Sequence, residues 1–231
     1  MGLLYGFDSY YIMLVLPAIL FALYAQSRVK GTFNKYSQYR NMQGYTGAQI
    51  ARSILDSQGL SDVRVENVDG HLTDHYDPKS KVVRLSQSVY GSTSVAAIGV
   101  AAHETGHAVQ HQVSYAPLAF RNSLVPVANI GSQAAIPLAI LGLIMRIEPL
   151  INFGIVLFSA VVAFQLITLP VEFNASSRAL EILETKRILT REELQPTKKV
   201  LNAAALTYVA AAAVGIANLL RLVLLSGRRR N

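Results

Sequence analysis

Cysteine is absent from all 231 residues of the chain. Its absence excludes disulfide bonds and thiolate ligands, so any metal bound here must be held by histidine and carboxylate groups. Acidic residues are also scarce: there are 14, against 21 Lys and Arg, and the net charge is +7 although 52% of the residues are hydrophobic. This balance is typical of a membrane protein, because positive charge collects at the cytoplasmic ends of spans. The basic residues form no single stripe with interleaved aromatic residues, which argues against nucleic acid as a partner.

No Lys or Arg precedes Arg28, so the N-terminal apolar stretch lacks the basic start of a cleaved signal peptide. Residues 3–25 are apolar over about the length that a bilayer requires. Leu23 stands where a cleavage site would need a small residue. We therefore expect residues 1–27 to form a retained first transmembrane helix. Its C-terminal end is predicted to lie in the cytoplasm, because basic residues follow at once: Arg28, Lys30, Lys35 and Arg40.

Two further apolar stretches, residues 124–145 and 150–169, are separated only by the short segment 146–149. They predict a transmembrane hairpin within residues 116–170. Both outer ends of such a hairpin lie on the same side of the membrane. The segments that enter and leave it are therefore expected to be neighbours in space.

Residues 171–189, which follow the hairpin, have a helical pattern. Thr190 and Glu193 then make a capping box for a second, short helix before Pro196.

The chain ends with an alanine-rich apolar stretch at residues 201–225, which is typical of a tightly packed fourth span within 201–231. Arg221 in this stretch is expected to extend its charge toward the interface. A four-span count places the basic tail, Arg228–Arg230, outside the cell. We expect the more numerous Lys and Arg near the earlier spans to outweigh these three charges in setting the orientation.

Residues 28–115 are predicted to form the main soluble part. Thr46 and Gln49 make a capping box for a helix that ends at Gly59. One strand is expected near residues 63–68, followed by a hairpin whose turn contains Pro78, so that the soluble part carries a small antiparallel sheet. Two uses of this sheet remain open: its edge can accept an extended peptide as an added strand, or the sheet only packs the domain. The apolar face of the first helix consists of Ile50, Ala51, Ile54 and Leu55.

The chemistry of the chain is concentrated in His103-Glu104-Thr105-Gly106-His107, on a helix expected to run from the Ser92–Ser94 caps to about His111. Residues four apart share a helix face, so His103 and His107 can bind one metal ion. Glu104 can reach water in an open coordination position and take its proton. This combination predicts a zinc hydrolase site with Glu104 as the general base. With only five His in the chain, such a spacing rarely arises by chance.

A third ligand is needed to complete the site, and Glu172 is the leading candidate. It follows the predicted hairpin, which brings it near the metal helix, and a carboxylate close to a span is costly without a partner. The alternative role for Glu172 is a salt bridge, for example to Arg178. His111 shares the face of His103 but lies about 12 Å along the helix axis, too far to bind the same ion.

Several sequence strings resemble the bacterial YugP-like neutral zinc metallopeptidases, which are small membrane proteins. The resemblance covers most of the chain and is carried by Thr46-Gly47 with Ile54-Leu55, Leu72-Thr-Asp-His-Tyr-Asp-Pro78, Val83-Arg-Leu-Ser86, Ala102-His-Glu-Thr-Gly-His107 and Leu169-Pro-Val-Glu-Phe-Asn-Ala-Ser176. It implies a gluzincin-type site, distantly similar to that of HtpX-type membrane peptidases, with His103, His107 and Glu172 binding one Zn²⁺ ion and Glu104 as base.

One position departs from that pattern. Many gluzincins have Asp four residues after the ligand Glu, where it orients a ligand histidine, whereas this chain has Ser176. Asn174 and Ser176 are the residues that could take over this orienting contact. A tetrahedral intermediate of peptide hydrolysis also needs a donor for its oxyanion. The candidates are His75, Arg178 and Tyr208, each of which also has an ordinary structural role open to it.

Together these features predict a mainly α integral membrane protein, with four transmembrane helices and a juxtamembrane α+β zincin-like catalytic domain. The expected parts are residues 1–27, 28–115, 116–170, 171–200 (the helix with the third ligand and a connector) and 201–231. The expected function is a multi-pass peptidase of the inner (plasma) membrane, with its site facing the cytoplasm and peptides or membrane proteins as substrates, serving membrane protein processing or quality control.

Two other functions compete with this one. A zinc-bound membrane scaffold would recruit partners without catalysis, but a purely structural site has no need of Glu104. A transporter is disfavoured because four spans with few charges offer little for a pathway. The oligomeric state is left open.

Overall fold

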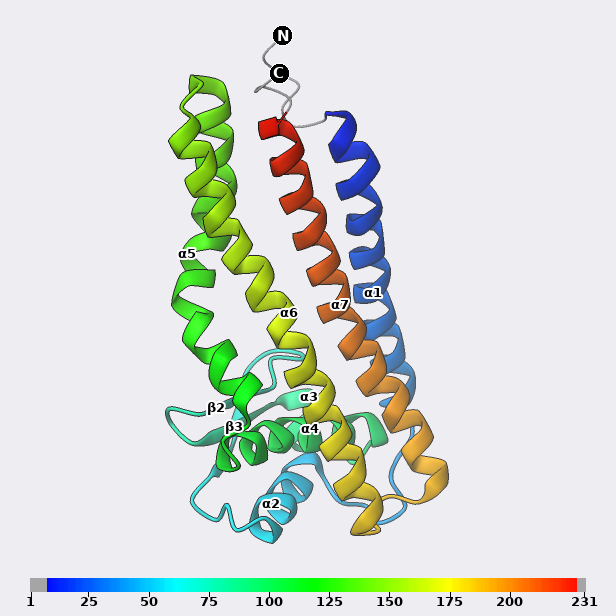
Figure 1. Cartoon of the computed structure of the whole chain (residues 1–231). Coiled ribbons are helices and arrows are strands. Elements are labelled where there is room, and N and C mark those ends of the chain that lie inside the picture. The colour runs from blue at the N-terminus through cyan, green and yellow to red at the C-terminus, as the bar shows by residue number, and fades with distance from the viewer. Residues whose placement is uncertain (1–7, 228–231) are drawn as a thin grey trace. The chain divides into compact units, whose positions relative to one another are not determined.

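The computed structural model describes residues 8–227 and is predominantly helical (Figure 1). The chain folds into two compact units. Unit 1 comprises residues up to 26, 120–169 and from 206 onward, and unit 2 comprises residues 27–119 and 170–205. Several long helices contribute residues to both units, so each unit is described by itself.

Unit 1 is built from apolar helices. Its elements are the π-helical segment η1 (Tyr11–Val15) and parts of four helices: α1 (Leu16–Tyr36), α5 (Ala116–Met145), α6 (Glu148–Thr185) and α7 (Arg191–Gly227). Within residues 8–227, the four helices 11–36, 116–145, 148–185 and 191–227 are long and apolar enough to cross a membrane. Small residues let α5, α6 and α7 approach closely, and their shared core includes Ala135, Ala139, Phe158, Val161 and Leu222.

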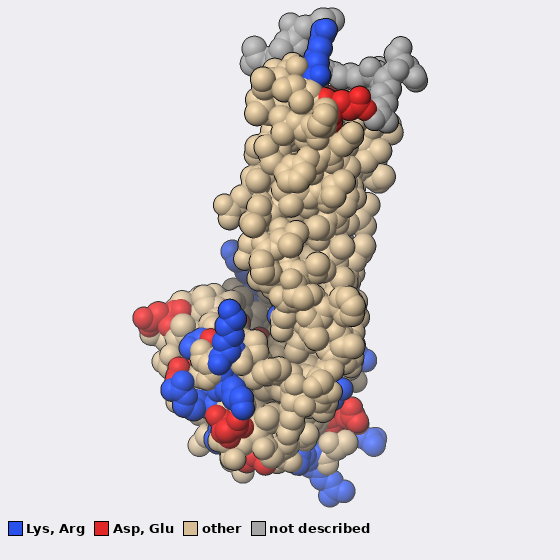
Figure 2. All heavy atoms as spheres, turned by 60° about the vertical axis from the view of Figure 1, so that its left-hand side comes forward, with Lys and Arg blue, Asp and Glu red and all other residues tan. Residues whose placement is uncertain are grey.

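Charged side chains are rare in the described part of unit 1, and the face of it seen in Figure 2 is largely without them. One pair is buried there. Arg221 of α7 donates to Asp8 through Nε at 2.9 Å and Nη2 at 2.7 Å, and its guanidinium lies over the ring of Tyr11. The expectation that Arg221 extends toward the interface is therefore wrong. It is only 6% exposed, because the carboxylate of Asp8 neutralises its charge inside the unit.

The helices of the second half of the chain are longer than the sequence predicts. α5 begins at Ala116, before the apolar stretch 124–145, and α6 continues through Pro170 to Thr185 without a new helix start. The short helix expected before Pro196 is also wrong, since α7 begins at Arg191 and includes this proline. A proline removes one backbone donor, but packed neighbours keep such helices continuous. The predicted capping box at the start of α7 is present, with Thr190 and Glu193 as reciprocal partners.

Unit 2 consists of short helices and strands that pack around the buried helix α4 (Val95–Gln112). In chain order these elements are α2 (Gly47–Ser57), β1 (Arg64–Val68), β2 (His75–Asp77), β3 (Val82–Ser86), α3 (Gln87–Tyr90) and α4 (Val95–Gln112). The capping box of α2 is confirmed, with Thr46 accepting from the Gln49 amide, and its predicted apolar face is buried. The Ser94 hydroxyl caps α4 by accepting from the Ala97 amide at 3.1 Å.

The three-stranded sheet of unit 2 is mixed, which corrects the prediction of an antiparallel sheet. Its order is β1-β3-β2, with β1 parallel to β3 and β2 antiparallel to β3. The predicted hairpin of β2 and β3 is present, but β3 occupies the centre. This strand has four buried residues of five, whereas β2 is the polar sequence His-Tyr-Asp and suits an edge. Since the chain reverses twice between β1 and β3, these two strands run in the same direction.

The Asp8–Arg221 pair yields a test of how unit 1 is stabilised. Replacing Asp8 by Ala leaves the Arg221 charge buried without its carboxylate, and we expect a loss of about 3 kcal/mol in the free energy of unfolding. Thermal unfolding in detergent measures it. The control is Asp62→Ala, which removes a carboxylate from the exposed pair with Lys81 and should change the stability little. Equal effects of the two variants would contradict this role of the buried pair.

Candidate metal centre

α4 holds the two predicted histidine ligands one helical turn apart. Their ring centroids are 4.8 Å apart and the rings are nearly perpendicular, at 86°. The small residues Ala96, Ala97, Ala101 and Ala102 of α4 are buried, and the last two immediately precede His103. The two imidazoles therefore project from a helix that is fixed by close packing.

The backbones of α4 and α6 approach each other closely at Gly106. A Cβ atom on Gly106 of α4 would lie 2.7 Å from the carbonyl oxygen of Ala175 on α6. Any side chain at position 106 would therefore push α6 away. Glu172 is three residues before Ala175, about one helical turn, so this contact sets the carboxylate opposite His103 and His107.

The three predicted ligands converge. Oε2 of Glu172 lies 3.2 Å from Nε2 of His103 and 3.6 Å from Nε2 of His107, and the three donor atoms lie within 4.8 Å of one another. Donor atoms that each sit 2.0–2.1 Å from a tetrahedral zinc are separated by about 3.3 Å. The observed donor set therefore fits a zinc ion. Glu172 is only 4% exposed and lies inside α6 rather than at a helix start.

Each of the two imidazoles also forms a hydrogen bond through its second ring nitrogen, Nδ1. Nδ1 of His103 lies 3.1 Å from the hydroxyl of Ser176, and Nδ1 of His107 lies 3.0 Å from Oε1 of Gln110. Metal-binding histidines almost always use the second ring nitrogen in this way, which fixes the orientation of the ring. Ser176 thus contacts a predicted ligand histidine from the position where the resemblance implies Asp.

Glu104 is buried beside the ligands, at 9% exposure. Burial raises the pKa of Glu104, and the nearby imidazoles of His103 and His107 oppose the rise. A carboxylate in such surroundings holds a proton more readily than one in water, which suits a group that accepts a proton and later gives it up.

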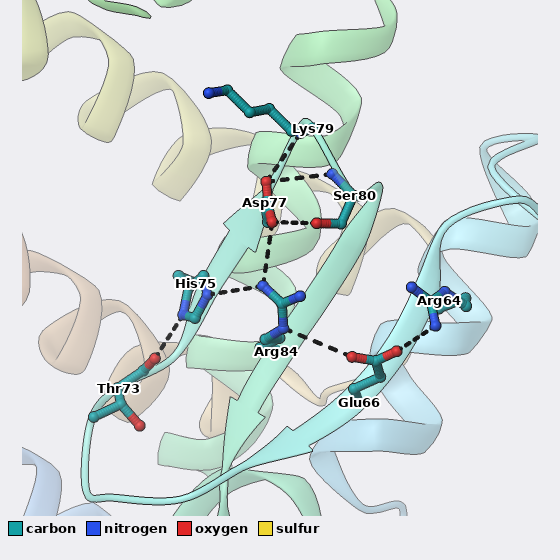
Figure 3. A network of polar contacts seen from close by, with 8 residues as sticks. All are labelled: Arg64, Glu66, Thr73, His75, Asp77, Lys79, Ser80 and Arg84. Carbon is teal, nitrogen blue, oxygen red and sulfur yellow. Dashed lines mark hydrogen bonds and ion pairs between the residues drawn. The ribbon is translucent and has the colours of Figure 1, made fainter. Parts of the chain in front are cut away.

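His75 lies in a separate polar network on one face of the sheet (Figure 3). Its Nδ1 is 2.8 Å from the carbonyl oxygen of Thr73 and its Nε2 is 3.4 Å from Arg84, which also pairs with Asp77 and Glu66. Because a carbonyl only accepts, Nδ1 of His75 carries the proton and Nε2 faces the guanidinium.

The remaining predicted residues are distributed as follows. Nε of Arg178 donates to Oδ1 of Asn174 at 2.8 Å, one turn away on α6. Tyr208 lies on α7 among the residues of unit 1. His111 is an exposed residue whose Nδ1 pairs with the Tyr76 hydroxyl at 2.9 Å, and it is not part of the ligand cluster.

Two residues of the centre are missed by reasoning from the sequence alone. Gly106 is predicted only as part of the metal-binding segment, and Gln110 carries no prediction. A signal for each exists: Gly106 separates the two ligands on a helix that must accept a neighbouring backbone, and Gln110 is a polar residue three positions after His107 on the same face.

A protein-family model described as "Putative neutral zinc metallopeptidase" matches residues 11–227. That match includes every residue of the cluster and nearly the whole chain. The chain belongs to this family. The resemblance stated from the sequence strings is thereby confirmed.

One similar protein is the "Putative membrane protease YugP" of Bacillus subtilis (strain 168). It is 52% identical over 223 residues, which cover 96% of this chain and 99% of that protein. No solved structure matches the chain. Membership of a zinc peptidase family and the fit of the His103, His107 and Glu172 donors agree on zinc as the metal for this site.

The close approach at Gly106 predicts that this glycine is needed for metal binding. In Gly106→Ala the new methyl group meets the Ala175 carbonyl, so α6 must shift and carry Glu172 with it. We expect zinc to bind about tenfold more weakly and the free energy of unfolding to fall by about 1 kcal/mol, the packing cost exceeding the gain in helix propensity. Competition with a zinc chelator and thermal unfolding measure the two effects.

Gly91→Ala is the matched control. A Cβ atom there meets nothing within 4 Å, and the backbone φ of Gly91 is −95°, which any residue adopts. This variant should bind zinc as the wild type does. If Gly106→Ala also kept wild-type zinc affinity, the contact with Ala175 would not be what positions Glu172.

Proposed function

We propose that the chain is a membrane-bound zinc metallopeptidase that hydrolyses peptide bonds at the cytoplasmic membrane interface. The observation that carries this proposal is the convergence of the His103, His107 and Glu172 donors beside the buried carboxylate of Glu104. Two histidines and a glutamate leave one position of a tetrahedral ion open, as catalytic zinc sites do. We propose that this chain binds one ion there, in a gluzincin-type arrangement.

Each residue of the centre has a distinct task in this mechanism. A zinc ion held by the three donors supplies Lewis-acid chemistry, which lowers the pKa of water and polarises a carbonyl group. Glu104 takes the proton from the attacking water and delivers it to the leaving amine. Ser176 and Gln110 hold the two imidazoles through Nδ1, so that Nε2 of each is directed at the same point.

The edge of the small sheet supports a peptide as the substrate. β2 is the outer strand next to β3, and it lies in the same unit as α4. An edge strand presents unpaired backbone groups to which an extended peptide can add as a further strand. We propose that the substrate is held in this way. Arg178 and Tyr208 stay the candidates for the oxyanion donor, because the proton of His75 is directed at the Thr73 carbonyl.

The membrane setting is supported by charge and chain order. Glu172 follows the apolar stretch 150–169 by three residues, and unit 2 contains most of the Lys and Arg of the chain. Positive residues stay on the cytoplasmic side, so we propose a site that faces the cytoplasm of a plasma-membrane protein. Membrane proteins and their juxtamembrane tails would then be the substrates, and processing or quality control the role.

If Glu104 is the general base, replacing it should abolish cleavage without affecting zinc binding. Glu104→Gln keeps the shape of the side chain but cannot accept the water proton. We expect cleavage of an unfolded protein such as casein to fall by a factor of about 10²–10⁴ while zinc content stays at one ion per chain. Cleavage by the wild type should stop when a chelator removes the metal. Glu181→Gln, an exposed change on α6, is the control and should cleave normally.

The same assay separates the two functions that the sequence leaves open. A scaffold that recruits partners through its metal site would bind zinc but cleave nothing in the wild type. If Glu104→Gln cleaved casein at the wild-type rate, Glu104 would not be the general base.

The proposed orientation can be tested because the chain has no native cysteine. A single cysteine at exposed Lys79, in the turn between β2 and β3, should react with a membrane-impermeant maleimide only after the cells are opened. A single cysteine at exposed Met145, at the end of α5, should react in intact cells. The reverse pattern would place the metal centre outside the cytoplasm.

A further inference from the structure

Gln110 is fully buried on α4, one turn beyond His107, and every polar atom of its side chain has a partner. Its Nε2 donates to the carbonyl oxygen of Val171 at 2.8 Å and to Oδ1 of Asn174 at 3.0 Å. Its Oε1 lies 3.0 Å from Nδ1 of His107. A buried amide with all its groups engaged has only one orientation available.

That orientation follows from the partners themselves. The Val171 carbonyl can only accept a hydrogen bond, so the NH₂ group of Gln110 must face it. The oxygen of the same amide then faces His107, where it can only accept. Nδ1 of His107 is therefore the nitrogen that carries a proton.

A second contact fixes the same orientation independently. Nε of Arg178 is a donor only, so the atom of Asn174 that it meets at 2.8 Å must be the oxygen. With its oxygen already directed at this point, Asn174 accepts from Gln110 rather than donating to it. The two acceptors, Val171 and Asn174, both belong to α6, the helix that carries Glu172.

The two histidines differ in this respect. The Ser176 hydroxyl beside Nδ1 of His103 can donate or accept, so it imposes no tautomer. The Gln110 carbonyl beside Nδ1 of His107 can only accept. His107 is thus the histidine whose Nε2 is assigned to the metal by the surrounding protein.

We propose that Gln110 is a positioning residue that, through the chain Arg178–Asn174–Gln110–His107, commits Nε2 of His107 to the metal and links this ligand to the helix of Glu172. The inference rests on the proposed role of His107 as a ligand. Gln110 touches no reacting atom and acts only through the imidazole. In the proposed enzyme it serves to hold the ligands of two helices in one geometry.

The test compares two changes at the same position in the full chain in detergent. Gln110→Met and Gln110→Glu both remove the donors to Val171 and Asn174, so both should lower the melting temperature of the zinc-free protein. Only Gln110→Met also removes the acceptor for His107. We expect the zinc dissociation constant, measured by chelator competition, to rise about 10–100-fold in Gln110→Met and to return to within about threefold of wild type in Gln110→Glu.

Cobalt supplies a readout that a loss of stability alone would not move. The visible absorption bands of the cobalt-substituted protein report ligand geometry, and we expect them to shift in Gln110→Met and to resemble wild type in Gln110→Glu. Gln112→Met is the control: Gln112 lies on the exposed side of α4 and donates to the Gln58 carbonyl, so both readouts should stay unchanged. Equal zinc affinity and equal spectra in the two Gln110 variants would overturn the proposal.

A variant farther along the chain covers the case in which the Gln110 variants do not fold. Asn174→Leu leaves Gln110 in place but removes one of its two anchors, and we expect zinc binding to weaken about threefold to tenfold. Unchanged zinc affinity in this variant would count against the proposal. His107→Ala separates a failure of the metal site from a failure of the positioning role. If His107→Ala binds zinc as tightly as wild type, His107 is not a ligand and the proposed metal site is wrong. If His107→Ala loses zinc but Gln110→Met binds it as tightly as wild type, only the positioning role of Gln110 is refuted.

Discussion

The candidate metal centre depends on a backbone contact that involves none of the predicted ligand atoms. α4 and α6 can approach closely only because position 106 has no side chain where the Ala175 carbonyl lies. The histidines belong to one helix and the carboxylate to the other, so the distance between the helices decides whether three donors can share one ion. A side chain only one carbon larger would separate groups that must lie about 3.3 Å apart.

Burying polar groups is costly, and both units meet this cost by pairing. In unit 1 the charge of Arg221 is held against Asp8, and in unit 2 Glu172 faces two imidazoles. Gln110 has no exposed surface, yet each of its polar atoms has a partner on His107 or α6. Such groups fix one arrangement, since any other would leave a donor or acceptor buried without a partner. Rigidity at the centre thus follows from satisfied hydrogen bonds as much as from apolar packing.

Features that depend on neighbours in sequence were predictable. The capping boxes at Thr46 and Thr190 join residues three apart, and the apolar face of α2 follows from helical periodicity alone. Strand order was not predictable in this way, because β1 and β3 pair across an intervening strand. The helix boundaries predicted at Pro170 and Pro196 were also wrong. Local rules treat proline as a boundary, whereas packed neighbours keep these helices continuous.

The amino-acid sequence by itself determined which residues could bind the metal: the spacing of His103 and His107 on a helix, and the return of a carboxylate after a hairpin, follow from helix geometry and from counting spans. Only the tertiary structure decided how these residues are held. The contacts of Gln110 with Val171, of Ser176 with His103 and of Asp8 with Arg221 each join elements that are far apart in the chain. No periodicity encodes such pairs, because each depends on the distance and rotation of two packed helices.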